Sequence, residues 1–204
     1  ALVFFAERII GGEDMASESE LKHLDERILE TPGFAIQNAI KEVARMGELA
    51  LLNVRLSVEG LIEKDLEKAK EVFQREKSIN ELQHGISNYL IKITNSPISE
   101  QEHMVVTGLF HTISDIERVG DHADNIAEHA EMVISNGIEF SDVAINEIQE
   151  IATTAYRGLE FAIQACAQGD NAVARQVIPI EHEVNKLEKA MRSQHIKRLT
   201  NEEC

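Results

Sequence analysis

Residues 114–128 read Ser114-Asp-Ile-Glu-Arg-Val-Gly-Asp-His-Ala-Asp-Asn-Ile-Ala-Glu128, and this stretch decides the fold class. At 100° per residue, apolar and small side chains form one stripe for burial: Leu109, Ile113, Ile116, Gly120, Ala123, Ala127 and Ala130. Acidic side chains form a second row beside this stripe: Glu117, Asp121, Asp124, Glu128 and Glu131. The pattern predicts an amphipathic helix whose small residues let another helix approach closely.

Helical periodicity extends outward from this stretch over most of the chain. Thr31 as N-cap and Pro32 at the first helical position predict one helix start. Further helices are expected from about residue 64, from Ser99, from Ser141 and from about residue 171, and Pro179 should kink or divide the last of them. No segment alternates with period two for long enough to form a sheet, so the sequence predicts an all-α fold.

A shift of 105 residues aligns the chain with itself. It superimposes three polar pairs: Asp65 on Asp170, Glu76 on Glu181, and Asn80 on Asn185. We therefore expect antiparallel three-helix-bundle repeats, with residues 31–137 as the first repeat and residues 138–204 as an incomplete second repeat of two helices. Two helices without a third would expose apolar seams, so we expect a homodimer; a closed five-helix monomer is the alternative.

Composition excludes several classes of function. The 204 residues carry 36 acidic and 20 basic side chains, a net charge of −16, which repels nucleic acids and anionic lipids but is compatible with cations. Cys166 and Cys204 provide no disulfide framework, and Cys166 lies on an expected core seam. No nucleophile elbow, P-loop or dinucleotide fingerprint is present, so no enzymatic activity is expected.

The acidic row indicates a candidate metal site. If the turn between the second and third helices centres near residues 96–97, antiparallel packing brings Glu76 and Glu117 to one level. Glu76, Asn80, Glu117 and Asp121 can then converge as oxygen ligands, which suit iron, manganese, magnesium or calcium. The alternative interpretation is a solvated acidic helix face.

The same residues resemble a known family. Residues 115–128 are similar to the signature of the PhoU family of phosphate-homeostasis proteins, which are built from two three-helix repeats whose E(D)xxxD motifs bind metal clusters, iron in some members. Glu117-xxx-Asp121 matches that motif. Residues 76–83 and 181–188 resemble its second-helix pattern, although Gln83 departs from it. The resemblance implies a second ligand set at Glu181, Asn185 and Glu188.

Residues 22–32 resemble the junction that leads into the PhoU-like tail of bacterial sodium/phosphate cotransporters. With this resemblance, the apolar residues 1–6 are interpreted as the stub of a removed membrane segment, and residues 1–30 as the segment following it. The implied protein is a metal-binding regulatory domain at the cytoplasmic face of the bacterial inner membrane. It would modulate phosphate uptake with its own membrane transport domain as partner, and phosphate would contact the bound cation.

Two alternatives remain open. One is a free-standing PhoU-type regulator of phosphate ABC transport. The other, from a different class, is a ferritin-like metalloenzyme using Glu81-x-x-His84 and Glu100-x-x-His103, which fit the ExxH spacing of di-iron bundles. The row of His111, His122 and His129 is expected to face solvent.

Overall fold

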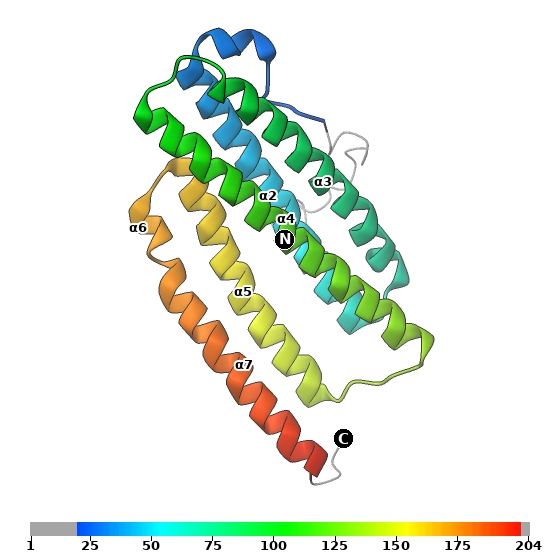
Figure 1. Cartoon of the computed structure of the whole chain (residues 1–204). Coiled ribbons are helices and arrows are strands. Elements are labelled where there is room, and N and C mark those ends of the chain that lie inside the picture. The colour runs from blue at the N-terminus through cyan, green and yellow to red at the C-terminus, as the bar shows by residue number, and fades with distance from the viewer. Residues whose placement is uncertain (1–19, 201–204) are drawn as a thin grey trace, which may run out of the picture.

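A computed structural model describes residues 20–200 of the chain, and these residues are helical almost throughout (Figure 1). The expectations for residues 1–6 and for Cys204 lie outside the described residues. The elements are, in order, η2 (Glu26–Glu30), α2 (Pro32–Glu63), α3 (Leu66–Thr94), α4 (Glu100–Ser135), α5 (Asp142–Gln168), α6 (Asn171–Ala174) and α7 (Val177–Thr200). The described residues contain no strand, and the predicted all-α fold is confirmed.

Local capping sets most of the helix boundaries. Ser99 forms a capping box with Glu102 at the start of α4, and the Ser141 hydroxyl accepts a hydrogen bond from the backbone of Ala144 at the start of α5. Thr31 occupies the N-cap of α2 as predicted, but its side chain makes no capping hydrogen bond. The start of α2 is therefore favoured by Pro32, whose fixed φ angle suits the first helical position.

The last helix is divided, as the proline predicted. α6 ends at Ala174 and α7 begins at Val177, so Pro179 falls in the first turn of α7. A first-turn proline costs little, because its missing N–H would have had no partner within the helix.

α2, α3 and α4 pack against one another around the main core. The stripe predicted on α4 is buried at six of its seven positions, and Ile116 is half-buried. A Cβ atom on Gly120 would stand 3.4 Å from Ile79 Cγ2, so the small residue lets α3 approach α4 closely. These three helices form a complete three-helix bundle.

α5 and α7 are arranged less compactly. Among the described elements, α5 packs against α2, α6 and α7, whereas α7 packs only against α5 and α6 (Figure 1). The last two helices therefore extend the bundle sideways, with α7 outermost.

The 105-residue repeat is visible in the geometry of the helix ends. Lys64 after α2 and Gly169 after α5 both adopt the left-handed conformation, with φ 57° and 64°. Asp65 and Asp170 follow them, and each caps the next helix through its side-chain carboxylate. The two helix junctions therefore share the same backbone conformation and the same aspartate cap, although α3 is continuous and its counterpart is divided into α6 and α7.

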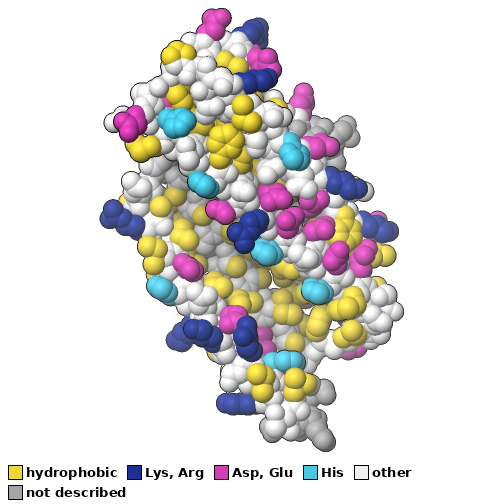
Figure 2. Space-filling view, viewed as in Figure 1, with side chains coloured by type: hydrophobic (Ala, Val, Ile, Leu, Met, Phe, Trp, Pro, Cys, Tyr) yellow, Lys and Arg dark blue, Asp and Glu magenta, His cyan; other side chains and the backbone are white. Residues whose placement is uncertain are grey.

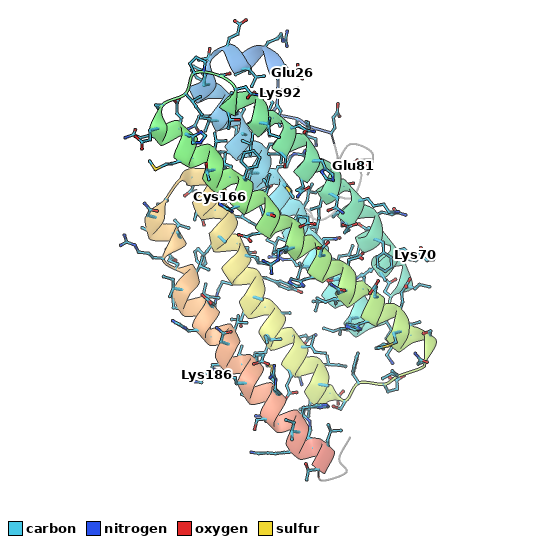
Figure 3. The ribbon with its side chains drawn as sticks, viewed as in Figure 1. Glu26, Lys70, Glu81, Lys92, Cys166 and Lys186 are labelled. Carbon is cyan, nitrogen blue, oxygen red and sulfur yellow. The ribbon has the colours of Figure 1, made fainter. Side chains whose placement is uncertain are left out.

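Hydrogen bonds and an ion pair hold residues 20–31 against α2 and α3. The Glu42 carboxylate is fully buried and accepts hydrogen bonds from the His23 backbone N–H at 2.9 Å and from Arg45 Nε at 2.8 Å. The Tyr89 hydroxyl donates to the Asp25 carbonyl at 3.1 Å. Glu26 forms an ion pair with Lys92, labelled together in Figure 3. This segment is packed structure rather than a free linker.

Candidate metal centre

The candidate centre lies on the hairpin formed by α3 and α4. The two helices run antiparallel through the short turn of residues 95–99, and acidic side chains gather over them on the face drawn in Figure 2. α3 supplies Glu76 and Asn80, and α4 supplies Glu117 and Asp121. The turn position used in the sequence prediction is therefore correct.

The pKa of Glu76 shows that the acidic side chains of α3 and α4 lie near one another. It is half-buried, and Asn80 Nδ2 donates a hydrogen bond to its Oε1. Burial raises the pKa of the Glu76 carboxyl, as do the charges of Asp124, Asp121 and Glu117, while the Asn80 hydrogen bond lowers it. The structure thus brings the three predicted carboxylates into one electrostatic neighbourhood.

Asp124 belongs to the same neighbourhood but was not among the predicted ligands. It is half-buried, and its pKa is raised by burial and by the charges of Glu128, Asp121 and Glu131, with Lys77 acting in the opposite direction. The sequence analysis placed Asp124 in the acidic row of α4. It selected only Glu117 and Asp121 from that row as metal ligands, because these two match the E-xxx-D spacing.

The second predicted ligand set has no facing helix in the described part of the chain. Glu181 and Asn185 are exposed on α7, and Glu188 pairs with Arg192 one turn further along. Because α7 packs only against α5 and α6 there, no carboxylate row faces these residues as α4 faces Glu76. The structure does not bring Glu181, Asn185 and Glu188 together with Glu117 and Asp121.

The donor set of the α3–α4 patch has the right chemistry for an oxygen-preferring cation. Carboxylate and amide oxygens are the ligands of such ions, and mutual repulsion among carboxylates is relieved by a bound cation. Within residues 20–200, however, no group of three or more His, Cys, Asp or Glu side chains is placed so that it could hold a metal ion. Binding at this patch would therefore require side chains to change rotamer.

The remaining side chains that the sequence analysis singled out are exposed, except for Cys166. Both acidic and both histidine members of the two ExxH motifs lie at the surface, and so do His111, His122 and His129, as expected. Cys166 is only half-buried; it packs against the main core at the upper end of α5 in Figure 3, and burial raises the pKa of its thiol.

One family model matches part of the chain. Residues 43–130 match the PhoU domain family, and these residues contain α3, most of α2 and all of the acidic row of α4 except Glu131. The resemblance to the PhoU family is therefore confirmed.

Relatives of two kinds are similar to the chain. The inorganic phosphate export protein YjbB of Salmonella typhimurium is 23% identical over 197 residues, covering 96% of this chain and 36% of the relative. A phosphate-specific transport system accessory protein PhoU homolog of Aquifex aeolicus is 26% identical over 153 residues, covering 74% and 68%. The chain thus spans about a third of the length of the export protein. No solved structure matches the chain.

Proposed function

We propose that this chain is a non-enzymatic regulatory domain of phosphate transport that binds a cation between α3 and α4. The observation that carries the proposal is the set of Glu76, Glu117, Asp121 and Asp124, whose charges meet across two helices and raise the pKa of Glu76. Such repulsion has no structural benefit, and a bound cation would remove it. The match to the PhoU domain and the names of the relatives supply the link to phosphate transport.

The cation would be iron, manganese, magnesium or calcium, held by Glu76, Asn80, Glu117 and Asp121, with Asp124 as an added candidate. A domain of net charge −16 repels phosphate, but a bound di- or trivalent cation inverts the local charge. Phosphate would therefore bind only in the presence of the cation.

Two settings for this domain fit the relatives. In the first, it is the regulatory part of a longer sodium/phosphate cotransporter-like protein at the cytoplasmic face of the inner membrane, because its match to the export protein covers 96% of the chain and 36% of the relative. In the second, it is a free-standing accessory protein like the PhoU homolog. No helix within residues 20–200 has the length and apolar composition needed to span a bilayer.

An antibody against this chain separates the two settings. Detection of a polypeptide longer than 204 residues in the membrane fraction supports the first setting. Detection of a polypeptide of about this length outside the membrane fraction supports the second.

The metal site is tested by removing two carboxylates. Glu117→Ala with Asp121→Ala should abolish stoichiometric metal in elemental analysis and in calorimetric titrations with Fe²⁺, Mn²⁺, Mg²⁺ and Ca²⁺. Helicity should be preserved, because both side chains lie beside the buried stripe rather than in it.

Glu181→Ala with Glu188→Ala is the matched control, since it removes the same charge from α7. It should leave metal binding intact because no acidic helix faces those residues in the described structure. Equal metal content in both double variants would disprove the site. Titration with inorganic phosphate, with and without the metal, then tests whether phosphate binding depends on the cation.

A further inference from the structure

A layer of buried polar side chains crosses the first bundle between two apolar clusters. On α3, buried apolar residues up to Val72 belong to one cluster, and those from Ile79 onward belong to the other. Four polar residues of α2 and α3, each at most 8% exposed, lie between the clusters: Asn53, Ser57, Arg75 and Ser78. Glu76 of the candidate centre therefore projects from α3 at the level of this polar layer.

Asn53 is the member of the layer that joins α2 to the turn carrying Glu76. Its side chain is fully buried, and its Nδ2 donates a hydrogen bond to the Val72 carbonyl oxygen, with 3.2 Å between the two atoms. In an α-helix the carbonyl of residue i accepts the N–H of residue i+4, so the Val72 carbonyl is also the acceptor for the backbone of Glu76. Asn53 thus holds the turn of α3 from which the Glu76 side chain extends.

This hydrogen bond fixes the position of α3 along the bundle axis. A buried asparagine specifies the register of packed helices at a cost in stability, whereas apolar side chains alone specify it less strictly. Because metal binding at the acidic patch requires side chains to change rotamer, the carboxylates can reach one ion only if their backbones stand at the right level. The level of Glu76 relative to Glu117 and Asp121 is therefore set in part from α2.

The second repeat forms the equivalent helix pair without a polar layer. The 105-residue shift places Gly158 at Asn53 and Ile180 at Arg75. A Cβ atom on Gly158 would stand 3.3 Å from Ile180 Cγ2, and Ile180 is 7% exposed, so apolar atoms pack closely at these positions. The fold does not require the amide, which in the first repeat destabilises it: Asn53 Oδ1 is buried and accepts no hydrogen bond from the described residues.

We infer that Asn53 is a positioning residue for the cation site, holding Glu76 at the level of Glu117 and Asp121. Asn53 is not itself a ligand, because its side chain is buried and bonded to the backbone of α3. The inference rests on the proposed function, since it assigns Asn53 a role in cation binding at that same site.

Calorimetric titration with Fe²⁺, Mn²⁺, Mg²⁺ and Ca²⁺ tests the inference. Asn53→Ala should weaken binding of the cation that the wild-type chain prefers by about 10- to 100-fold, the usual effect of removing a group that orients a metal ligand. Ser57→Ala is the matched control. Ser57 is equally buried, but its hydroxyl donates to the Val54 carbonyl of its own helix at 2.8 Å, so the affinity should not change.

A second variant separates positioning from stability. Asn53→Gly with Arg75→Ile copies the apolar pair of the second repeat into the first, so the chain should fold and melt at or above the Tm of Asn53→Ala. Its affinity should stay as low as that of Asn53→Ala, although loss of a positive charge next to Glu76 favours cations. An affinity that returned with stability would overturn the inference by making Asn53 a purely structural residue.

Hydrogen exchange in the metal-free chain provides a readout that needs no cation. Asn53→Ala should speed exchange in residues 72–80 but not in residues 86–93 of the same helix, and Ser57→Ala should change neither. Equal cation affinity in the wild-type chain and Asn53→Ala would overturn this inference and leave the proposed function intact. A wild-type chain that bound none of the four cations would overturn the proposed function, and this inference with it.

Discussion

Glu76 faces the acidic row of α4 from α3, and its carboxyl has a pKa raised above the ordinary value of 4.5 by burial and by three neighbouring negative charges. The folded chain therefore binds this proton more tightly than the unfolded chain does. The contribution of Glu76 to stability is favourable at low pH and falls as pH rises from about 4.5 through the raised pKa. At neutral pH without a cation, the ionised carboxylate lowers the stability of the fold.

Replacing Glu76 with glutamine should therefore stabilise the metal-free protein at pH 7. We expect Tm to rise by about 1–2 °C, the size of a small charge effect in a domain of this length, and the gain to disappear below about pH 4.5. With saturating metal, the order should reverse, because the variant lacks a ligand. Thermal melts at both pH values measure the effect, and Glu81→Gln, exposed on the same helix, is the control. A lower Tm for Glu76→Gln at pH 7 without metal would contradict this account.

For single residues, the sequence predicted which acidic side chains of α3 and α4 come near one another, but not whether they bind a metal ion. The periodicity of α4 placed Glu117 and Asp121 on one row, and counting from the turn brought Glu76 to their level. The burial of Asp124 could not be predicted, because it depends on how closely and at what tilt α3 lies against α4. The rotamers that decide whether three carboxylates hold one ion are also set by tertiary packing rather than by spacing.

At the scale of helices, the two equivalent C-caps differ in their residues. Lys64 and Gly169 both adopt the left-handed conformation, which is strained for lysine and unstrained for glycine. Lys64 also pairs with Glu139 at 2.6 Å, but Glu139 is 84% exposed, so this ion pair contributes little. The same backbone position is therefore better stabilised in the second repeat than in the first.

Opposite substitutions at these caps should have opposite effects. Lys64→Gly should stabilise the chain by about 1 kcal/mol, and Gly169→Ala should destabilise it by about the same amount. Urea unfolding measures both. Gly108→Ala is the control within a helix: nothing lies within 4 Å of its added Cβ, so it should be mildly stabilising. A destabilising Lys64→Gly would mean that the ion pair outweighs the backbone strain.

Helix boundaries were predictable because their signals are local. Ser99, Ser141 and the repeated aspartates cap the residues next to them, and Pro179 excludes a continuous last helix. The missing side-chain bond of Thr31 was not predictable, because the same residue type caps a helix in one backbone conformation and not in another.

For the whole molecule, the sequence left two arrangements of the last helices open. An apolar seam shows that a face is to be covered, but it does not say by what. In the structure, α5 closes on α2, and α7 contacts only α5 and α6 among the described elements. That choice depends on contacts such as Ile163 against Gly47, where an added Cβ would stand 3.0 Å from Ile163 Cγ1.

This arrangement predicts a gradient of local stability in the monomer. At concentrations low enough for a monomer, amides of α7 should exchange fastest, those of α5 at an intermediate rate, and those of α2 and α4 slowest, because each step outward loses packed neighbours. Hydrogen exchange followed by mass spectrometry measures the order. Equal protection of α7 and α2 under those conditions would contradict it.

The bonds that hold residues 20–31 against α2 and α3 determine how the molecule would respond to a pulling force. A force applied to the chain ahead of residue 20 would load the bonds to Glu42 and Tyr89 before it reached the start of α2. Leu21 braces the same segment against Gly85, where an added Cβ would stand 2.8 Å from its Cδ1. Tension would therefore act on the sides of α2 and α3, at Glu42 and near the C-terminal end of α3, before it could unwind α2 from its first turn, and α3 is also the helix that carries Glu76.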